Sequence, residues 1–186
     1  RIVIGKDTRR SSYMFEYTLI AGLTASGADA YMLHVTTTPS VAYIARVDAF
    51  DCGIMISASH NPYFDNGIKL INSQGEKMDE SVISLIGNRY PELPYALREN
   101  IGKTVDYASG RNRYIGYLIS LGMYSFRGMK VGLDCANGSS WNIAKAVFEA
   151  LGATAYVINA ERIEYQRKCG VDAYRSIAKI CQEKPS

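Results

Sequence analysis

The alternation of short strand-like runs with longer helix-like segments is the feature that most constrains the fold of this chain. A β-branched run at 1–5 precedes a segment at 12–27 whose apolar residues recur at helical spacing. Strand, helix and strand patterns follow at 29–35, 40–49 and 52–57. Strands and helices in this order form mostly parallel sheets that helices cover. The sequence therefore predicts an α/β fold built on a mixed, mostly parallel sheet sandwiched by helices.

Local signals indicate where some of these elements begin and end. Ser11 or Ser12 is a candidate N-cap of the first helix, because a serine hydroxyl can accept a hydrogen bond from the free N–H groups of the first turn. Gly27 is expected to end that helix. The run at 67–72 returns after only a short loop, so we predict that it pairs antiparallel or lies at a sheet edge.

The second half of the chain starts the same pattern again. The stretch 91–110 has two prolines and mixed charge, and it is interpreted as a linker or surface excursion. A helix at 111–122 then leads to a strand, turn, helix and strand at 129–159. We therefore predict a first domain at 1–110 and a second, similar α/β domain at 111–186. The pattern starts within a strand and stops before a third strand of the second domain, so we expect missing segments on both sides. The unpaired edge of such an incomplete sheet would favour association with another copy of the chain.

Composition excludes several classes of protein. The net charge is only +3 and basic residues are scattered, so there is no basic stripe for nucleic acid. No apolar run approaches the ~18 residues of a membrane span, and the first residues do not resemble a signal peptide. The cysteines are widely spaced, which favours free thiols in a reducing compartment over disulfides or a zinc site. We therefore expect a cytoplasmic protein. The cysteines are Cys52, Cys135, Cys169 and Cys181.

The stretch "ISASHNPYFDNGIKLIN" at 56–72 places reactive side chains on a short loop between two apolar runs. Loops at the carboxyl ends of strands in open α/β sheets carry the reacting groups. A serine there can act as a nucleophile or carry a covalent group, the imidazole can move a proton, and the lysine can neutralise an anion. The turn at Asp65-Asn66-Gly67 makes positive φ available and would bring the lysine back toward the serines. The candidate side chains are those of Ser57, Ser59, His60, Asn61 and Lys69.

The residue types alone leave other interpretations open. Ser, Asn, Asp, Gly and Pro also make up ordinary surface turns. A serine hydrolase triad fits poorly, because there is no Gly-x-Ser-x-Gly and His34 is the only other histidine. "GKDTRRSS" at 5–12 is either an anion site at a helix N-terminus or, as its composition favours, a capping turn with solvated arginines. "DCANGSS" at 134–140 lacks the spacing of a P-loop or a dinucleotide fingerprint and is interpreted as structural.

Taken together, these stretches closely resemble the α-D-phosphohexomutase family. "SASHNPYFDNGIKLIN" resembles the family's active-site serine loop, and its wording is most similar to the phosphoglucosamine mutase branch. The phosphomannomutase/phosphoglucomutase branch tends to carry glycine in place of Ala58. The segments 4–30, 36–46 and 128–153 resemble the family's early strand and helix, its Thr-Pro segment and the opening of its second domain.

The resemblance implies an activity and a role for each candidate residue. This branch interconverts glucosamine 6-phosphate and glucosamine 1-phosphate through a phosphoserine and a sugar 1,6-bisphosphate, on the way to UDP-N-acetylglucosamine and cell-wall precursors. By the family motif, Ser59 carries the phosphoryl group. His60 and Lys69 would handle the proton or stabilise charge during the transfer, and Arg9 and Asn61 would position the serine loop or its phosphate.

The resemblance also implies a magnesium ion. In the family this ion lies between the phosphoserine and three aspartates of an Asp-Gly-Asp-x-Asp-Arg loop, and no such loop occurs in this sequence. Of this chain, Ser59 would therefore contact the metal, through its phosphate. The chain alone is expected to be inactive. Two alternatives stay open: a phosphoglucomutase or phosphomannomutase with the same chemistry, and a non-catalytic module that binds a sugar phosphate or a protein partner.

Overall fold

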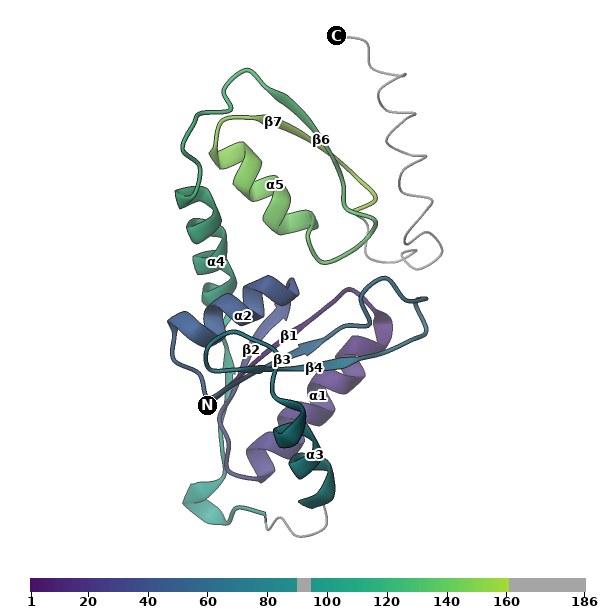
Figure 1. Cartoon of the computed structure of the whole chain (residues 1–186), viewed down its shortest axis with the longest axis vertical. Coiled ribbons are helices and arrows are strands. Elements are labelled where there is room, and N and C mark those ends of the chain that lie inside the picture. The colour runs from purple at the N-terminus through teal and green to yellow at the C-terminus, as the bar shows by residue number, and fades with distance from the viewer. Residues whose placement is uncertain (90–94, 161–186) are drawn as a thin grey trace.

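The computed structural model describes residues 1–89 and 95–160, and these residues form two sheets flanked by helices (Figure 1). The larger sheet has the strand order β4-β3-β1-β2-β5, and its pairs are parallel except for β3 with β4. This arrangement confirms the predicted mixed, mostly parallel sheet. Its strands are β1 (Ile2–Lys6), β2 (Ala30–Val35), β3 (Cys52–Ile56), β4 (Ile68–Asn72) and β5 (Thr104–Asp106). The helices of this part are α1 (Arg10–Ala25), α2 (Thr38–Val47), α3 (Glu80–Arg89) and α4 (Ala108–Ser120), with a 3-10 turn at Arg98–Asn100.

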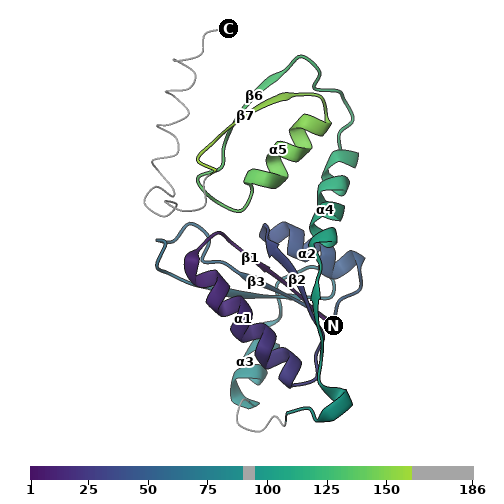
Figure 2. The same ribbon diagram turned by 180° about the vertical axis from the view of Figure 1, so that it is seen from behind.

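Alternating side chains of the central strands build a core on each face of the larger sheet. Successive strand residues point to opposite faces, so Val3 and Met55 pack with Val41 and Ile44 of α2. On the other face, Ile4, Ile54 and Ile56 pack with Ile20, Phe15, Leu19 and Leu23 of α1. Figures 1 and 2 show α1 across one face of the sheet and α2 across the other. The sheet is thus held between helices, as the sequence predicts.

The start of α1 differs from the prediction. Neither Ser11 nor Ser12 caps the helix; the N-cap residue is Arg9, and no side chain caps its backbone. The hydroxyl of Ser12 is fully buried and instead donates to Oδ1 of Asp7 at 2.6 Å. The Ser12 hydroxyl therefore bonds to the Asp7 carboxylate and not, as one of the two predicted caps, to the N–H groups of the first helical turn. The predicted end of the helix is confirmed, because Gly27 follows it with φ +91.

The two edges of the larger sheet had different signals in the sequence. The run at 67–72 forms β4, which pairs antiparallel with β3 at one edge, as predicted. The linker interpretation of 91–110 is wrong for 104–106, because these residues form β5, which pairs parallel with β2 at the opposite edge. Three residues are too few to show a strand periodicity. Residue 110 lies inside α4, and the division into two domains near it stays a prediction.

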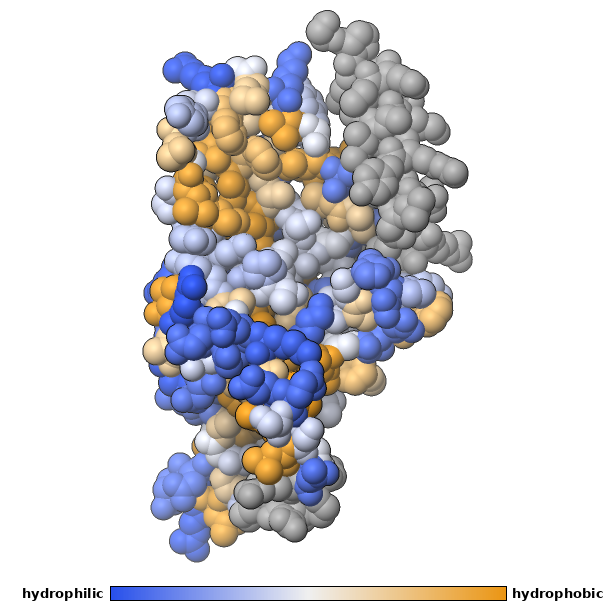
Figure 3. Space-filling model, viewed as in Figure 1, coloured by the Kyte–Doolittle hydropathy of each residue, from blue (hydrophilic) through white to orange (hydrophobic). Residues whose placement is uncertain are grey.

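The second sheet contains β6 (Lys130–Asp134) and β7 (Thr154–Ile158), which pair in parallel and are joined by α5 (Trp141–Ala150). This confirms the second βαβ unit. Helix α4 connects it to the larger sheet: the ring of Tyr117 stacks on that of Tyr43 in α2, with 4.3 Å between the ring centroids, and α4 also packs against α5. Figure 3 shows hydrophobic residues gathered over α5.

In the described residues, no helix has both the length and the apolarity to cross a membrane.

A buried ion pair fixes the end of β1 against α1. Lys6 and Glu16 are each 1% exposed, and the ammonium of Lys6 bonds to the Glu16 carboxylate. The same ammonium lies 3.4 Å from the centroid of the Tyr13 ring, a cation–π contact. A charge removed from water in this way is tolerated only with such partners. The point at which the chain leaves β1 is therefore well defined.

Gly5 is predicted to be essential to the packing of β1 under α2. A Cβ at this position would lie 2.5 Å from Cγ2 of Val41 and 2.7 Å from Cγ2 of Thr36. We expect Gly5→Ala to lower the free energy of unfolding by about 1–3 kcal/mol through overpacking. Gly22→Ala is the matched control, because nothing lies within 4 Å of its added Cβ; helix propensity should make it more stable by about 0.5–1 kcal/mol. Urea unfolding measures both, and equal midpoints for the two variants would contradict the prediction.

Candidate active site

Four strand-to-helix or strand-to-loop connections meet around one cavity of about 460 Å³. Each follows the carboxyl end of a parallel strand, which is where open α/β sheets bind ligands. The lining residues are 7–9 after β1, 37–39 after β2, Ser57, Ser59, His60 and Tyr63 after β3, and 136–140 after β6, together with Met55 of β3. The serine loop therefore lies in a cavity to which both sheets contribute.

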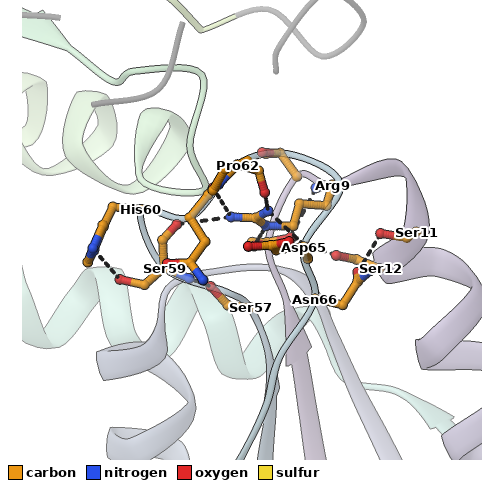
Figure 4. A network of polar contacts seen from close by, with 12 residues as sticks. Arg9, Ser11, Ser12, Ser57, Ser59, His60, Pro62, Asp65 and Asn66 are labelled. Carbon is orange, nitrogen blue, oxygen red and sulfur yellow. Dashed lines mark hydrogen bonds and ion pairs between the residues drawn. The ribbon is translucent and has the colours of Figure 1, made fainter. Parts of the chain in front are cut away.

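The two serines of the loop have different surroundings (Figure 4). Ser57 is only 9% exposed, and its Oγ accepts a hydrogen bond from the backbone N–H of Ser59 at 3.1 Å. Ser59 is exposed at the cavity, and its Oγ lies 3.4 Å from Nδ1 of His60. The first hydroxyl thus supports the loop. The second is accessible to a ligand and has an imidazole beside it.

Ser59 adopts a backbone conformation that residues with a side chain rarely occupy. Its φ is 56°, in the left-handed region, which costs a residue with a Cβ roughly 1–2 kcal/mol. Strained residues of this kind cluster at functional sites, because the surrounding structure must hold them there. The surroundings of Ser59 supply such restraint, since Ser57 accepts from its N–H and Arg9 donates to its carbonyl.

This strain predicts a difference between two substitutions of Ser59. Ser59→Gly should unfold with a free energy about 1 kcal/mol higher than Ser59→Ala, because glycine adopts positive φ without the steric cost of a Cβ. Both variants lack the hydroxyl, so the comparison isolates the backbone. Side-by-side thermal and urea unfolding would measure the difference. An alanine variant as stable as the glycine variant would mean that position 59 relaxes to negative φ.

The turn after Pro62 differs from the predicted one. Neither Asn66 nor Gly67 has positive φ, and the tight turn lies earlier, where the N–H of Asp65 donates to the carbonyl of Pro62 at 3.0 Å. Gly67 is needed for space: its Cβ would lie 2.8 Å from the carbonyl oxygen of Ser57. The N–H of Ser57 donates to the Gly67 carbonyl at 2.8 Å, which closes the base of the loop.

Arg9 binds the serine loop from inside the protein. It is 6% exposed, so the prediction of solvated arginines is wrong for it, whereas Arg10 is exposed. Its Nε donates to Oδ2 of Asp7 at 2.8 Å. Its two terminal nitrogens donate to the carbonyl oxygens of Ser59, Asn61, Pro62 and Asp65. The fork-shaped guanidinium suits this multiple donation, and it ties the whole loop to the start of α1 (Figure 4).

Asn61 and Lys69 are not among the residues that line the cavity, whereas the two serines and His60 are. The structure describes contacts of Asn61 through its backbone: its carbonyl accepts from Arg9 at 2.9 Å and its N–H donates to Ala58 at 3.1 Å. Lys69 is half-buried opposite Met55 in the β3–β4 pair, so it shares the face of Met55, but it is not among the lining residues. Their assigned roles stay predictions.

Sequence reasoning missed two of the four turns. The Thr37–Pro39 turn and the 136–140 turn both line the cavity, although the second was interpreted as structural. Thr8 also lines it, and its Oγ1 donates to the carbonyl of Asn137 at 2.8 Å. The available signal was position: each segment directly follows a strand that runs parallel to its neighbour. Using it requires the strand order, which the sequence does not reveal.

The described residues do not make a magnesium site by themselves. Among them there is no group of three His, Cys, Asp or Glu side chains placed to hold a metal. Asp7, the carboxylate that lines the cavity, is already occupied: Oδ1 accepts from the Arg9 N–H and the Ser12 hydroxyl, and Oδ2 accepts from the Arg9 side chain. A metal here would need carboxylates from elsewhere.

Cys52 and Cys135 are free thiols. Burial raises the pKa of both thiols above the usual range, which keeps them protonated and weakly nucleophilic at neutral pH. They are therefore suited to packing rather than to chemistry. Cys169 and Cys181 lie outside the described residues.

Comparisons with known proteins give consistent matches. Residues 1–95 match the sequence model of phosphoglucomutase/phosphomannomutase, alpha/beta/alpha domain I. The phosphoglucosamine mutase of Lachnospira eligens is 71% identical over 164 residues, which are 86% of this chain and 36% of that protein. The phosphoglucosamine mutase of Lachnoclostridium phytofermentans is 59% identical over 189 residues, 98% of this chain and 42% of that protein. The chain thus spans about two fifths of the length of these curated relatives.

Solved structures share the fold. A phosphoglucomutase/phosphomannomutase family protein of Burkholderia thailandensis superposes with a TM-score of 0.76 at 21% identity, covering 90% of this chain and 37% of that one. The open form of parafusin, a phosphoglucomutase of Paramecium, gives a TM-score of 0.61 at 19% identity, covering 99% of this chain and 41% of that one. At such identities the likeness concerns the architecture alone.

Proposed function

Since this chain belongs to the phosphoglucomutase/phosphomannomutase family, we propose that it forms the phosphoryl-carrying part of a phosphoglucosamine mutase. The proposed enzyme interconverts glucosamine 6-phosphate and glucosamine 1-phosphate, and supplies the precursor of UDP-N-acetylglucosamine in the cytoplasm. Two relatives with 71% and 59% identity bear the name phosphoglucosamine mutase, which favours glucosamine over other hexoses. Because the chain covers 36% and 42% of these relatives, it is not expected to be active by itself.

The difference between the two serines of the loop carries the proposal. The Ser57 hydroxyl is buried and used by the backbone, whereas the Ser59 hydroxyl is exposed in the cavity beside His60. Phosphoryl transfer requires mainly in-line positioning and neutralisation of charge on the phosphoryl oxygens. A loop held rigidly by Arg9 satisfies the first requirement, because it fixes the direction in which Ser59 Oγ leaves the backbone.

The proposed reaction consists of two transfers. In the first, the bond between phosphorus and Ser59 Oγ breaks, a bond from this phosphorus to a sugar hydroxyl oxygen forms, and the proton of that hydroxyl passes to Ser59 Oγ. The product is a sugar 1,6-bisphosphate, which reorients within the cavity so that its other phosphate faces Ser59. In the second, the bond between the other phosphorus and its sugar oxygen breaks, a bond from this phosphorus to Ser59 Oγ forms, and the serine proton passes to the released sugar oxygen.

The neighbours of Ser59 have distinct proposed roles. His60 would take and return the proton, and the 3.4 Å between its Nδ1 and Ser59 Oγ supports this role. Lys69 would add positive charge near the transferred group, and Arg9 and Asn61 would hold the loop. Magnesium stays part of the proposal through the family resemblance, with Ser59 as its contact by way of the phosphate. The described residues do not supply carboxylates for this ion, so neither transfer is assigned to it.

The test is the mass of the proteolytic peptide that contains Ser59, from the full-length gene product purified out of its own cells. We expect one phosphoryl group on Ser59, retained in Ser57→Ala, absent from Ser59→Ala, and discharged by glucosamine 6-phosphate. Discharge by glucose 6-phosphate or mannose 6-phosphate alone would assign the protein to another branch of the family. A peptide that stays unmodified with magnesium and a sugar 1,6-bisphosphate would overturn the mutase proposal and leave a binding module.

A further inference from the structure

Three consecutive residues after β1 connect three different parts of the molecule. The N–H of Asp7 donates to the carbonyl of Ile56 at 2.9 Å, at the end of β3. Arg9 donates to the carbonyls of the serine loop. Between them, Thr8 Oγ1 donates at 2.8 Å to the carbonyl of Asn137, which also lines the cavity and belongs to the second βαβ unit. Residues 7–9 therefore hold both the serine loop and the second βαβ unit.

The acceptor of the Thr8 hydrogen bond is itself held by the second unit. The N–H of Asn137 donates to the carbonyl of Asn159 at 2.6 Å, just beyond β7. The carboxylate of Asp134, at the end of β6, accepts from the N–H of Ala136 at 2.9 Å and from the Asn159 side chain at 3.0 Å. The turn at 136–140 therefore moves with β6 and β7, and a bond to its carbonyl constrains the position of the whole unit.

We propose that Thr8 is a positioning residue that sets the width of the cavity between Ser59 and the turn at 136–140. This inference rests on the proposed function. Ser59 and His60 line one side of the cavity and the turn lines another, so the Thr8 bond limits how far these sides separate. Both transfers need the sugar within reach of Ser59 Oγ, and the bisphosphate must stay in the cavity between them. Without this bond the cavity would widen. Both transfers would then be slower, and more of the bisphosphate would escape into solution.

The test compares Thr8→Val, Thr8→Ser and the unchanged full-length gene product. Valine keeps the shape but cannot donate, whereas serine keeps the hydroxyl. For Thr8→Val we expect kcat to fall about fivefold, the magnitude of one ordinary hydrogen bond, with KM changed less than about twofold. The fraction of turnovers that release free sugar 1,6-bisphosphate should rise by a similar factor. Thr8→Ser should restore both. Thr18→Val is the matched control, because its hydroxyl bonds only within α1, to the Met14 carbonyl, and is exposed.

Each outcome separates this inference from the proposal on which it rests. If the full-length protein without substitutions carries no phosphoserine and has no mutase activity, the proposed function itself is overturned. A phosphorylated, active protein in which Thr8→Val has unchanged kcat and bisphosphate release would overturn the role of Thr8 alone. A raised KM at unchanged kcat would also overturn it, because that pattern belongs to a direct binding contact. Thermal unfolding of Thr8→Val, expected within a few degrees of the unchanged protein, excludes a general loss of fold.

Discussion

Ser59→Ala is expected to lower the rate of phosphoryl transfer by the full-length protein on the order of 10⁴-fold or more. In the proposed reaction, Ser59 Oγ carries the phosphoryl group between the two transfers, so a variant without this oxygen cannot complete either of them. The backbone keeps its left-handed φ and the contacts of Arg9, since these involve carbonyl groups. The loss should therefore occur in kcat with little change in stability. A coupled assay for glucosamine 1-phosphate measures it.

Ser57→Ala is the matched control for this prediction. It removes an identical hydroxyl two residues away, one that accepts from the Ser59 N–H and does not reach solvent freely. We expect a loss of less than about tenfold, corresponding to one ordinary hydrogen bond. If Ser57→Ala were the inactive variant and Ser59→Ala retained turnover, the assignment of the two serines would be reversed.

Arg9→Ala is expected to lower the free energy of unfolding by about 3 kcal/mol and to lower kcat more than 100-fold. Its removal leaves Asp7 as a buried charge without its partner, a change that typically costs about 3–5 kcal/mol. It also leaves four loop carbonyls without their donor. The loop that carries Ser59 would then adopt many conformations, and misplacement by about 1 Å is enough for a loss on the order of 100-fold.

Two further variants make the Arg9 prediction specific. Arg10→Ala removes the same side chain from the next position, which is exposed, and should change stability by no more than about 0.5 kcal/mol. Arg9→Lys keeps the charge but loses the planar fork, so it should retain the pairing with Asp7 and still lose most of the loop contacts. Urea unfolding and steady-state kinetics measure all three. Equal effects of the alanine variants at positions 9 and 10 would contradict a specific hold on the loop.

Prediction from sequence succeeded where the signal is periodic and local. Strands and helices with several apolar residues per face were found, including the antiparallel β4 and the second βαβ unit. It failed at β5, whose three residues carry no periodicity. At position 67 the need for glycine was correctly predicted, but for the wrong physical reason. The sequence suggests positive φ there, whereas the structure shows a close approach to the Ser57 carbonyl.

The site itself shows a second limit. The serine loop was found because its reactive residues are adjacent in the chain. The burial of Arg9 and the bond from Thr8 to Asn137 were not, because their partners lie about 50 and 129 positions away. Hydrogen bonds to backbone carbonyls leave no trace in the identity of the accepting residue. Contacts of this kind emerge only once the strand order brings the turns together.

Helix α4 is a stiff arm that is fixed to the larger sheet near both of its ends. The hydroxyl of Tyr107, just before the helix, donates to Asp48 at 2.8 Å, and Tyr117, in the last turn of the helix, stacks on Tyr43. At about 1.5 Å per residue these two anchors lie roughly 15 Å apart along the helix axis, so together they oppose any tilt of the helix. The helix therefore follows the larger sheet. A movement of the second βαβ unit would have to pivot where the chain leaves α4 after Ser120, and the bond between Thr8 and Asn137 would oppose it.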